Sequence, residues 1–167
     1  FNGSGGQYPA RITAIDRKSV RASVGDFEPV ELESALCLQL GIAISRGERM
    51  DWVVQKATEL GASSIAPLLS ERTEVRLDPD RAEKKLRHWQ QIAISACEQC
   101  GRNRIPRLAP LASIQAWVSA TEADRKLVLH HRAINSGANA AVPSSIALLI
   151  GPEGGLSEVE IGLAESA

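Results

Sequence analysis

The residues that could do chemistry gather around one glycine-rich stretch, GPEGG at 151–155. It follows an apolar run that ends at Ile150 and precedes a helix that Ser157 can cap. In open α/β sheets, ligands bind at the carboxyl ends of strands, where glycines let the backbone approach them closely. The stretch matches neither a phosphate-binding P-loop nor the GxGxxG fingerprint. It is therefore either a cofactor loop or a strand-to-helix turn that needs positive φ, and Glu153, which has no packing reason to lie there, favours the first.

Two further polar clusters follow apolar runs of the sequence. His130-His131 end the run that begins at Lys126, and a charged cluster at 71–74 follows the run 64–69. If these strands are parallel, their carboxyl ends meet at one sheet edge together with the glycine stretch. Adjacent residues on a strand point to opposite faces, so at most one histidine contacts a ligand and no metal pair is expected. The cluster at 71–74 belongs to the site or forms a solvated loop.

The cysteines allow a redox, a zinc or a packing interpretation of Cys97-x-x-Cys100. No second pair of ligands at short spacing accompanies it, and the pair lies near a helix end rather than a helix start, so we expect two small apolar side chains on a buried helix face. With Cys37, three cysteines are too few for a disulfide framework, which fits a reducing compartment. No apolar run approaches the ~20 residues of a membrane span, so we expect a cytoplasmic protein without a membrane partner.

The net charge of -1 hides a basic segment. Between Arg76 and Arg107 there are eight Lys and Arg against four Asp and Glu. The densest part is the loop Gly101 to Arg104, where two guanidinium groups flank Asn103. Arginine forks suit bidentate contacts with phosphates or base edges, so this loop is either a nucleic-acid contact or a solvated loop.

The elements that must position these residues change character along the chain. With 167 residues, 44% hydrophobic and 23% charged, the composition is that of an ordinary folded domain, not of a disordered or collagen-like chain. The first part predicts short strands at 8–15, 19–24 and 27–32, a piece of a β domain. From residue 35 onward, buried apolar runs alternate with helices, which predicts an α/β fold with a parallel sheet. The apolar runs are 36–44, 64–69, 126–130 and 146–150.

Three helices are predicted between these runs. The first, at 49–60, has Trp52 on its apolar face and exposed residues such as Arg49 opposite, and Gly61 ends it. The second begins at Asp78 or Asp80 and runs to Cys100. A shorter one spans 113–120, with Trp117 in the core, and residues 135–145 read as a surface loop.

Three separated motifs resemble the RsmE family of bacterial 16S ribosomal RNA (uracil-N3)-methyltransferases, members of the SPOUT superfamily. They are LIGPEGGLS at 149–157, KATELG at 56–61 followed by Pro67 and Ser70-Glu71-Arg72, and ACEQCGR at 96–102 followed by Pro106. Their order along the chain makes a chance match improbable. The resemblance runs from Phe1 to Ala167.

The resemblance implies a SPOUT-type parallel sheet with a C-terminal trefoil knot, a homodimer, S-adenosylmethionine as cofactor and 16S rRNA of the small ribosomal subunit as partner. Residues 1–34 would be part of a PUA-like RNA-binding β-barrel, and 35–167 the methyltransferase domain. The family continues past Ala167 with the segment that threads the knot, so we expect the cofactor site to be incomplete. The resemblance assigns cofactor contacts to Leu129, His130, Ile150, Gly151, Pro152, Gly154 and Gly155, and RNA contacts to Arg46, Arg102, Asn103 and Arg104.

Methylation of uracil N3 explains which catalytic groups to expect. The N3 proton has a pKa of roughly 9 to 10, so attack on the methyl group requires removing it or stabilising the O2/O4 oxyanion that results. Arg72 is the candidate oxyanion stabiliser and Glu153 the candidate base. N3 lies on the Watson–Crick edge, so the base must be unpaired or flipped. The alternatives are a non-catalytic RNA-binding protein with a SPOUT-like scaffold and a nucleotide-phosphate enzyme that uses the glycine loop.

Overall fold

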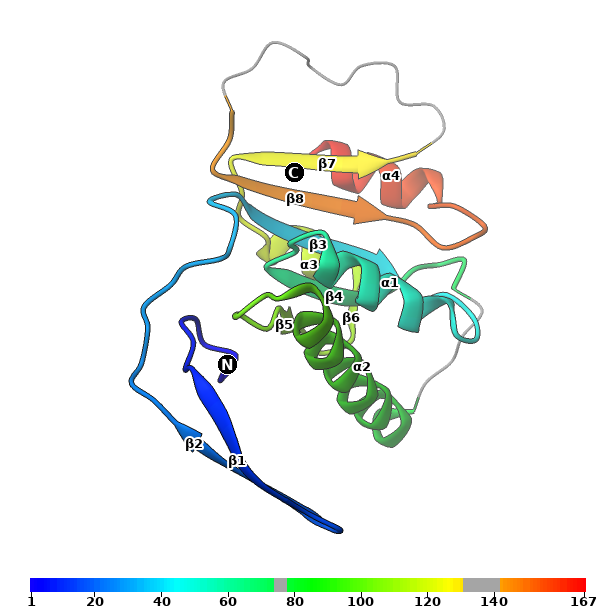
Figure 1. The fold of residues 1–167 in the computed structure, drawn as a ribbon. Coiled ribbons are helices and arrows are strands. Elements are labelled where there is room, and N and C mark those ends of the chain that lie inside the picture. Colours follow the sequence, from blue (N-terminus) through cyan, green and yellow to red (C-terminus); the bar gives the residue numbers. More distant parts are fainter. Residues whose placement is uncertain (74–77, 131–141) are drawn as a thin grey trace.

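The computed structural model describes residues 1–73, 78–130 and 142–167 (Figure 1). Near the N-terminus, β1 (Ala10–Asp16) and β2 (Ser19–Val24) form an antiparallel hairpin that projects from the rest of the molecule. The third strand predicted at 27–32 is wrong, because only Glu28 makes a β-bridge, with Gln7. The remainder of that segment is held by side chains instead of a sheet partner.

A six-stranded parallel sheet follows, as the apolar runs predicted. Its strands are β3 (Cys37–Ala43), β4 (Ser64–Leu69), β5 (Arg107–Leu108), β6 (Ala112–Ser113), β7 (Arg125–Leu129) and β8 (Ser145–Ile150). The order is β5-β4-β3-β8-β7, and β6 also pairs with β4. The chain moves outward from β3 to β4 and then returns from β7 to β8, so the order reverses between β3 and β8. That reversal is where α/β sheets bind ligands.

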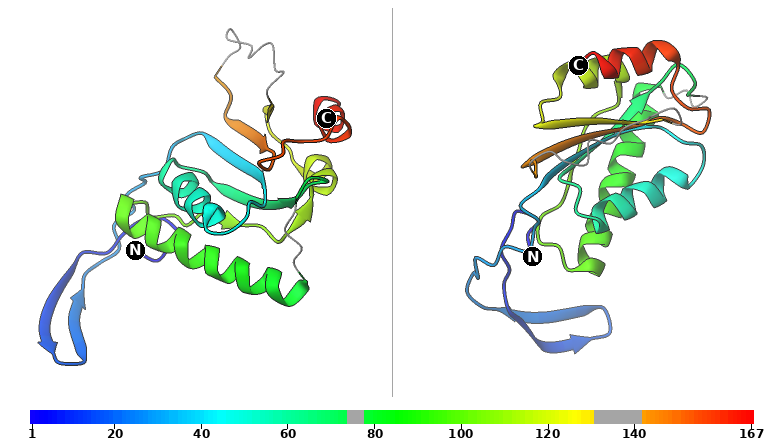
Figure 2. Two further views of the ribbon diagram at one scale, coloured as in Figure 1. Left: turned by 90° about the vertical axis from the view of Figure 1, so that its right-hand side faces the viewer. Right: turned by 90° about the horizontal axis from the view of Figure 1, so that it is seen from above.

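Helices cover both faces of the sheet (Figure 2). On one face, α1 (Arg49–Glu59) and α2 (Pro79–Cys100) pack through Met50, Val54 and Trp89. On the other face, α3 (Ile114–Ala120) and α4 (Glu158–Glu165) pack through Val118 and Ile161. None of the helices within the described ranges is long and apolar enough to cross a membrane.

Local signals set the helix ends as predicted. Asp78 caps α2 by accepting from Arg81 N at 2.9 Å, and Gly101 ends that helix at φ 81°. Ser157 caps α4 in a capping box with Glu160. Side-chain acceptors and left-handed glycines act within a few residues, so they can be recognised without tertiary information.

Two predictions about helix faces are corrected. Trp52 is 63% exposed, because the residues of α1 that face the core are Met50, Val54 and Thr58. The buried helix face holds for Cys97 but not for Cys100, which is exposed. Burial raises the pKa of the Cys97 thiol, which disfavours the thiolate that redox or zinc chemistry would need.

One contact joins the two helices on the first face of the sheet, and another joins a helix on the second face to the sheet itself. Asp51 on α1 accepts hydrogen bonds from His88 Nε2 at 2.8 Å and Trp89 Nε1 at 2.9 Å on α2. Burial alone would raise the pKa of Asp51, but these hydrogen bonds lower it below its ordinary value. On the other face, Trp117 packs over the backbone of Gly41 in β3, where a Cβ atom would lie 2.8 Å from the indole ring. Trp117 is thus partly buried at the core, as expected.

Candidate ligand-binding site at the strand ends

A pocket of about 380 Å³ lies at the carboxyl ends of β7 and β8. It brings together both predicted catalytic residues and all the predicted cofactor contacts. Those lining residues are Arg72, Leu129, His130, Ile150, Gly151, Pro152, Glu153, Gly154 and Gly155. Leu156 and Ile161 from the start of α4 complete the lining. Three segments far apart in the sequence therefore meet where parallel sheets bind ligands. His131 and most of the predicted surface loop 135–145 lie outside the described residues.

The glycine loop is both a tight turn and a wall of this pocket. Gly155 has φ 70° and donates to Pro152 O at 2.8 Å. A Cβ at Gly151 would lie 3.0 Å from Leu156 N and 2.9 Å from Leu156 Cγ, so a side chain there would push the loop open. A Cβ at Gly154 would meet only Arg72 Cβ at an ordinary 3.6 Å and Arg72 Cδ beyond it. The strand-to-helix turn with positive φ is confirmed, and the same backbone lines the pocket, so the cofactor loop stays a prediction.

Arg72 is presented to the pocket by a turn that is hydrogen-bonded to itself. Thr73 N donates to Ser70 O at 3.1 Å, and Ser70 N donates to Thr73 Oγ1 at 2.9 Å. From this turn, Arg72 Nη1 reaches across to donate to Gly154 O at 2.8 Å. Of the charged cluster after β4, Arg72 therefore lines the pocket, and Glu74 lies outside the described residues.

Glu160 ties that turn to the start of α4. One carboxylate oxygen accepts from Ser157 N at 2.9 Å, which is the capping contact, and the other accepts from Glu71 N at 2.8 Å. Sequence reasoning missed this second contact. The available signal was the Ser-x-x-Glu spacing, which indicates the capping contact and says nothing about the partner of the other oxygen.

Glu153 lies at the rim of the pocket and pairs with Arg49 from the start of α1, with Nη1 2.9 Å from Oε1. Both side chains are largely exposed, so the pair adds little stability. Its own backbone N–H, and then Arg49, lower the pKa of Glu153 below the ordinary value. Arg49 was expected on a solvated helix face; it is exposed, but it points toward the site.

His130 closes the other side of the pocket. Its side chain is 11% exposed, and Nε2 lies 3.5 Å from Glu165 Oε1 on α4. Leu129, one residue earlier, is exposed and offers an apolar edge. No group of three or more His, Cys, Asp or Glu side chains within residues 1–73, 78–130 and 142–167 is arranged to hold a metal ion.

The predicted RNA-contacting arginines separate into two groups. Arg46 is exposed on the loop after β3, at the same sheet edge as the pocket, and Arg104 is exposed but pairs with Glu31 at 2.9 Å. The prediction that Arg102 and Asn103 contact RNA is corrected, because the Arg102 side chain is 10% exposed and Asn103 is 2% exposed. The Arg102 guanidinium and Asn103 Nδ2 bind other parts of this chain, so these side chains do not form a solvated RNA-binding surface.

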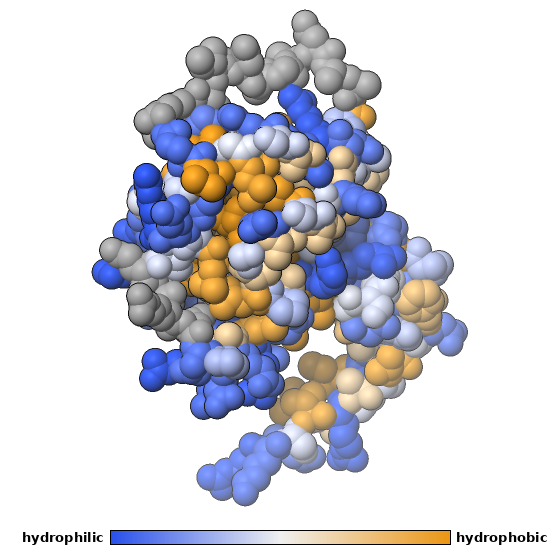
Figure 3. All heavy atoms as spheres, turned by 180° about the vertical axis from the view of Figure 1, so that it is seen from behind, coloured by the Kyte–Doolittle hydropathy of each residue, from blue (hydrophilic) through white to orange (hydrophobic). Residues whose placement is uncertain are grey.

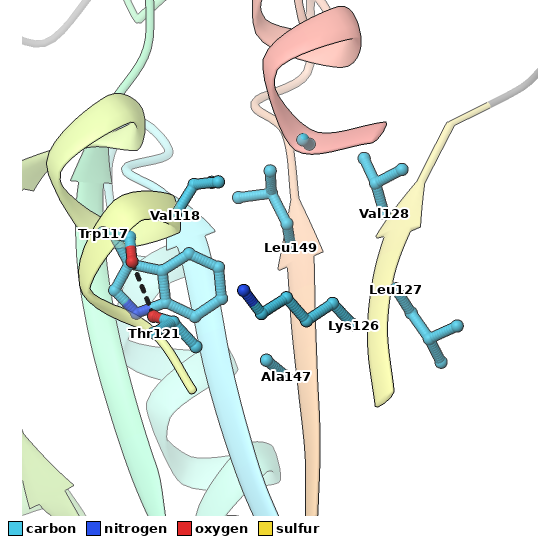
Figure 4. A pocket seen from close by; sticks show the side chains of 9 residues that line it. Trp117, Val118, Thr121, Lys126, Leu127, Val128, Ala147 and Leu149 are labelled. Atoms are coloured by element: carbon cyan, nitrogen blue, oxygen red, sulfur yellow. Dashed lines mark hydrogen bonds between the residues drawn. The ribbon is translucent and has the colours of Figure 1, made fainter. Parts of the chain in front are cut away.

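A second cavity lies between α3 and strands β7 and β8 (Figure 4). Its lining is mostly apolar, and the Lys126 side chain extends across it toward Trp117. At about 20 Å³ it has room for little more than a water molecule. It is a packing defect behind the sheet and no candidate for the site.

The fold and the pocket define a parallel α/β protein whose sheet is covered on both faces and whose glycine loop lines a pocket at the strand ends. The sequence matches the RNA methyltransferase domain family over residues 32–167. The chain belongs to this family, and the resemblance to RsmE is confirmed.

Named relatives agree with that assignment. The chain is 36% identical to ribosomal RNA small subunit methyltransferase E of Buchnera aphidicola (Schizaphis graminum), covering 96% of this chain and 66% of the relative. It is 28% identical to the protein of that name from Bacillus subtilis, covering 94% and 65%. The crystal structure of the Neisseria gonorrhoeae enzyme of that name, bound to S-adenosyl methionine, superposes with a TM-score of 0.89 at 37% identity and covers 99% of this chain and 69% of that one. The chain thus spans just under two thirds of the length of these two sequence relatives.

Proposed function

We propose that this chain is part of an S-adenosylmethionine-dependent methyltransferase that methylates N3 of a uridine in 16S ribosomal RNA. The observation that carries the proposal is the convergence of Arg72, the glycine loop and the end of β7 on one pocket in a chain of the RNA methyltransferase domain family. Relatives named for methylation of small-subunit ribosomal RNA, one of them crystallised with the cofactor, support it.

The residues present fit S-adenosylmethionine. The pocket volume lies within the ~300–1,000 Å³ common for small-molecule sites. Leu129, Ile150 and Leu156 offer apolar surface for an adenine ring, and the backbone of 151–155 offers N–H and C=O groups without side chains in the way. When bound, the cofactor supplies a methyl group activated by its sulfonium.

Arg72 is the residue we propose for stabilising the substrate. Loss of the N3 proton places negative charge on O2 and O4 of uracil, and a guanidinium beside them lowers the energy of that anion. The group has five N–H donors, so its bond to Gly154 O leaves others to face a substrate. Glu153 is a weak base, since its lowered pKa and its pairing with Arg49 hold it as a carboxylate. It serves better to hold the loop.

The partners of this chain are inferred from the same family assignment. Arg46 is exposed after the carboxyl end of β3, on the sheet edge that RNA approaching the strand ends would meet. The homodimer stays a prediction of the resemblance; apolar side chains gather on the face of the molecule that Figure 3 shows, where a second copy could pack. The trefoil knot, the PUA-like barrel of residues 1–34 and the cytoplasmic location stay predictions of the resemblance.

Three measurements test the proposal, two on the full-length protein and one on ribosomal RNA. Isothermal titration should show binding of S-adenosylmethionine, and Arg72→Ala should keep that binding while lowering kcat by about a hundredfold. Arg87→Ala, an exposed arginine of α2, is the matched control. Primer extension on ribosomal RNA from a strain that lacks the protein should lose the stop at the N3-methylated uridine. Absence of cofactor binding, or a stop that persists, would overturn the assignment.

A further inference from the structure

The loop after α2, residues 101–104, joins three parts of the chain that are distant in sequence. We infer that Arg102, Asn103 and Arg104, together with Glu31 and Glu33, form a clasp that fixes the N-terminal hairpin relative to the sheet domain, and that Arg102 is its central positioning residue. For its catalytic consequence the inference rests on the proposed function, whereas the clasp itself rests on contacts within the chain.

Arg102 binds the segment that connects the hairpin to the sheet, through Glu33. Its Nε lies 3.1 Å from each carboxylate oxygen of Glu33, and Nη2 also donates to that carboxylate. The two side chains are 10% and 15% exposed, so water and salt screen this pair far less than a surface pair. The bidentate geometry sets an orientation as well as a contact.

The same guanidinium binds the end of α1. Nη1 donates to Thr58 O at 2.7 Å and to Ala62 O at 3.0 Å. Carbonyl groups at a helix C-terminus lack helical partners and carry partial negative charge, so a cation is favourable there. One side chain therefore joins the sheet domain, through α1, to the segment that leads out of the hairpin.

Asn103 and its neighbours hold both ends of the hairpin segment. Asn103 Nδ2 donates to Val30 O at 2.8 Å, and its backbone carbonyl accepts from Gly5 N at 2.9 Å. Ile105 N donates to Gly3 O at 3.1 Å. The chain entering β1 and the chain leaving β2 are thus fastened to the same short loop, next to the exposed pair of Arg104 and Glu31.

These contacts show that the basic loop at 101–104 binds other segments of the same chain. Each of its two arginines pairs with a glutamate of the segment 31–33, so the densest positive charge of the sequence is neutralised within the chain. The hairpin itself points away from the sheet (Figures 1 and 2). Its orientation relative to the pocket therefore depends on the clasp. Any RNA held by the N-terminal part would then meet the pocket at a set distance.

Cleavage by a glutamate-specific protease tests the clasp without any assay of activity. Its target sites after Glu31 and Glu33 lie in the clasped segment. We expect Arg102→Ala to speed cleavage there about tenfold, because opening of the segment is no longer opposed by the ion pair. Arg87→Ala, which removes an exposed arginine of α2 paired with Glu83, should leave the rate unchanged. Glu33→Gln keeps Arg102 on the carbonyl groups at the end of α1 and serves if Arg102→Ala does not fold. Because it removes the target site after Glu33, its cleavage is compared with that of wild type at the site after Glu31 alone.

Kinetics then test the positioning role. Arg102→Ala should raise KM for ribosomal RNA about tenfold while the Kd for S-adenosylmethionine stays within about twofold, since Arg102 does not line the strand-end pocket. Equal protease cleavage of wild type and both clasp variants, or an unchanged KM for RNA in a variant whose segment is released, would refute the inference. If wild-type protein fails to methylate RNA, the proposed function falls while the protease result still decides on the clasp.

Discussion

Replacing Glu160 by glutamine tests whether one carboxylate holds the two sides of the pocket together. Its oxygens accept from Ser157 N at 2.9 Å and from Glu71 N at 2.8 Å. A glutamine has one acceptor oxygen and a donor NH₂ group, so it can satisfy only one of these two N–H groups. The other N–H group would face the NH₂ group of the glutamine. Either the turn that carries Arg72 or the start of α4 would then lose the hydrogen bond that holds it.

The expected loss of stability follows from those contacts. A hydrogen bond to a charged group contributes about 1.5–3 kcal/mol, and a carboxylate at a helix N-terminus adds about 0.3–1 kcal/mol. Because the contact with Glu71 is exposed, the lower end applies, and we expect Glu160→Gln to lower the free energy of unfolding by about 1–2 kcal/mol. Ser157→Ala is the matched control, since it removes the weaker 3.3 Å contact from Glu160 N and leaves both carboxylate bonds in place.

Urea denaturation measures the loss of stability, and amide hydrogen exchange at Glu71 locates it. Glu160→Gln should speed exchange of the Glu71 N–H, whereas Ser157→Ala should not, although both weaken the cap of α4. If the two variants release the Glu71 amide equally, Glu160 acts only as a helix cap. A change of less than about 0.3 kcal/mol for Glu160→Gln would show that the bridge carries no net stability.

Four other substitutions have definite expected outcomes. Gly41→Ala should lower the free energy of unfolding by about 1–3 kcal/mol in thermal or urea denaturation, because its Cβ would lie 2.8 Å from the Trp117 ring; an unchanged stability would refute this close packing. Gly151→Ala should weaken S-adenosylmethionine binding in titrations by about tenfold or more, and Gly154→Ala clearly less, since only the first crowds the loop backbone; equal losses would contradict the geometry. Asp51 has a lowered pKa in the folded state, so its contribution is complete above the ordinary aspartate pKa and is lost as pH falls through the lowered value. The stability difference between wild type and Asp51→Asn should therefore shrink in acid, and a difference independent of pH would count against it.

Local features of the fold could be predicted from the sequence, and their long-range partners could not. The strand β4 and the cap of α2 at Asp78 follow from apolar runs and from residues within three positions of each other. The strand predicted at 27–32 does not form, because only Glu28 of this segment has a β partner. That partner, Gln7, precedes the hairpin in the sequence. The prediction that Trp52 lies on the buried face of α1 was wrong, because a helical spacing of apolar residues defines one face of a helix but not which edge of that face reaches the core.

The site shows the same division. The sequence alone identified the glycine loop, Arg72 and the end of β7 as candidates, since each follows an apolar run and the carboxyl ends of parallel strands share an edge. Only the tertiary structure decided that Arg72 donates to Gly154 O and that Glu160 bridges to Glu71. Spacing along the chain does not determine which groups meet across a fold.

The basic loop at 101–104 shows this difference between sequence and structure most clearly. Sequence composition revealed a basic loop at 101–104, and a loop rich in arginine reads as exposed when its partners are unknown. The structure buries Arg102 against Glu33 and the end of α1 instead. Helices and their caps depend on hydrogen bonds between near neighbours, which the sequence determines by itself. The burial of a charge depends on whether a distant segment brings an opposite charge to it, and that is decided only when the chain folds.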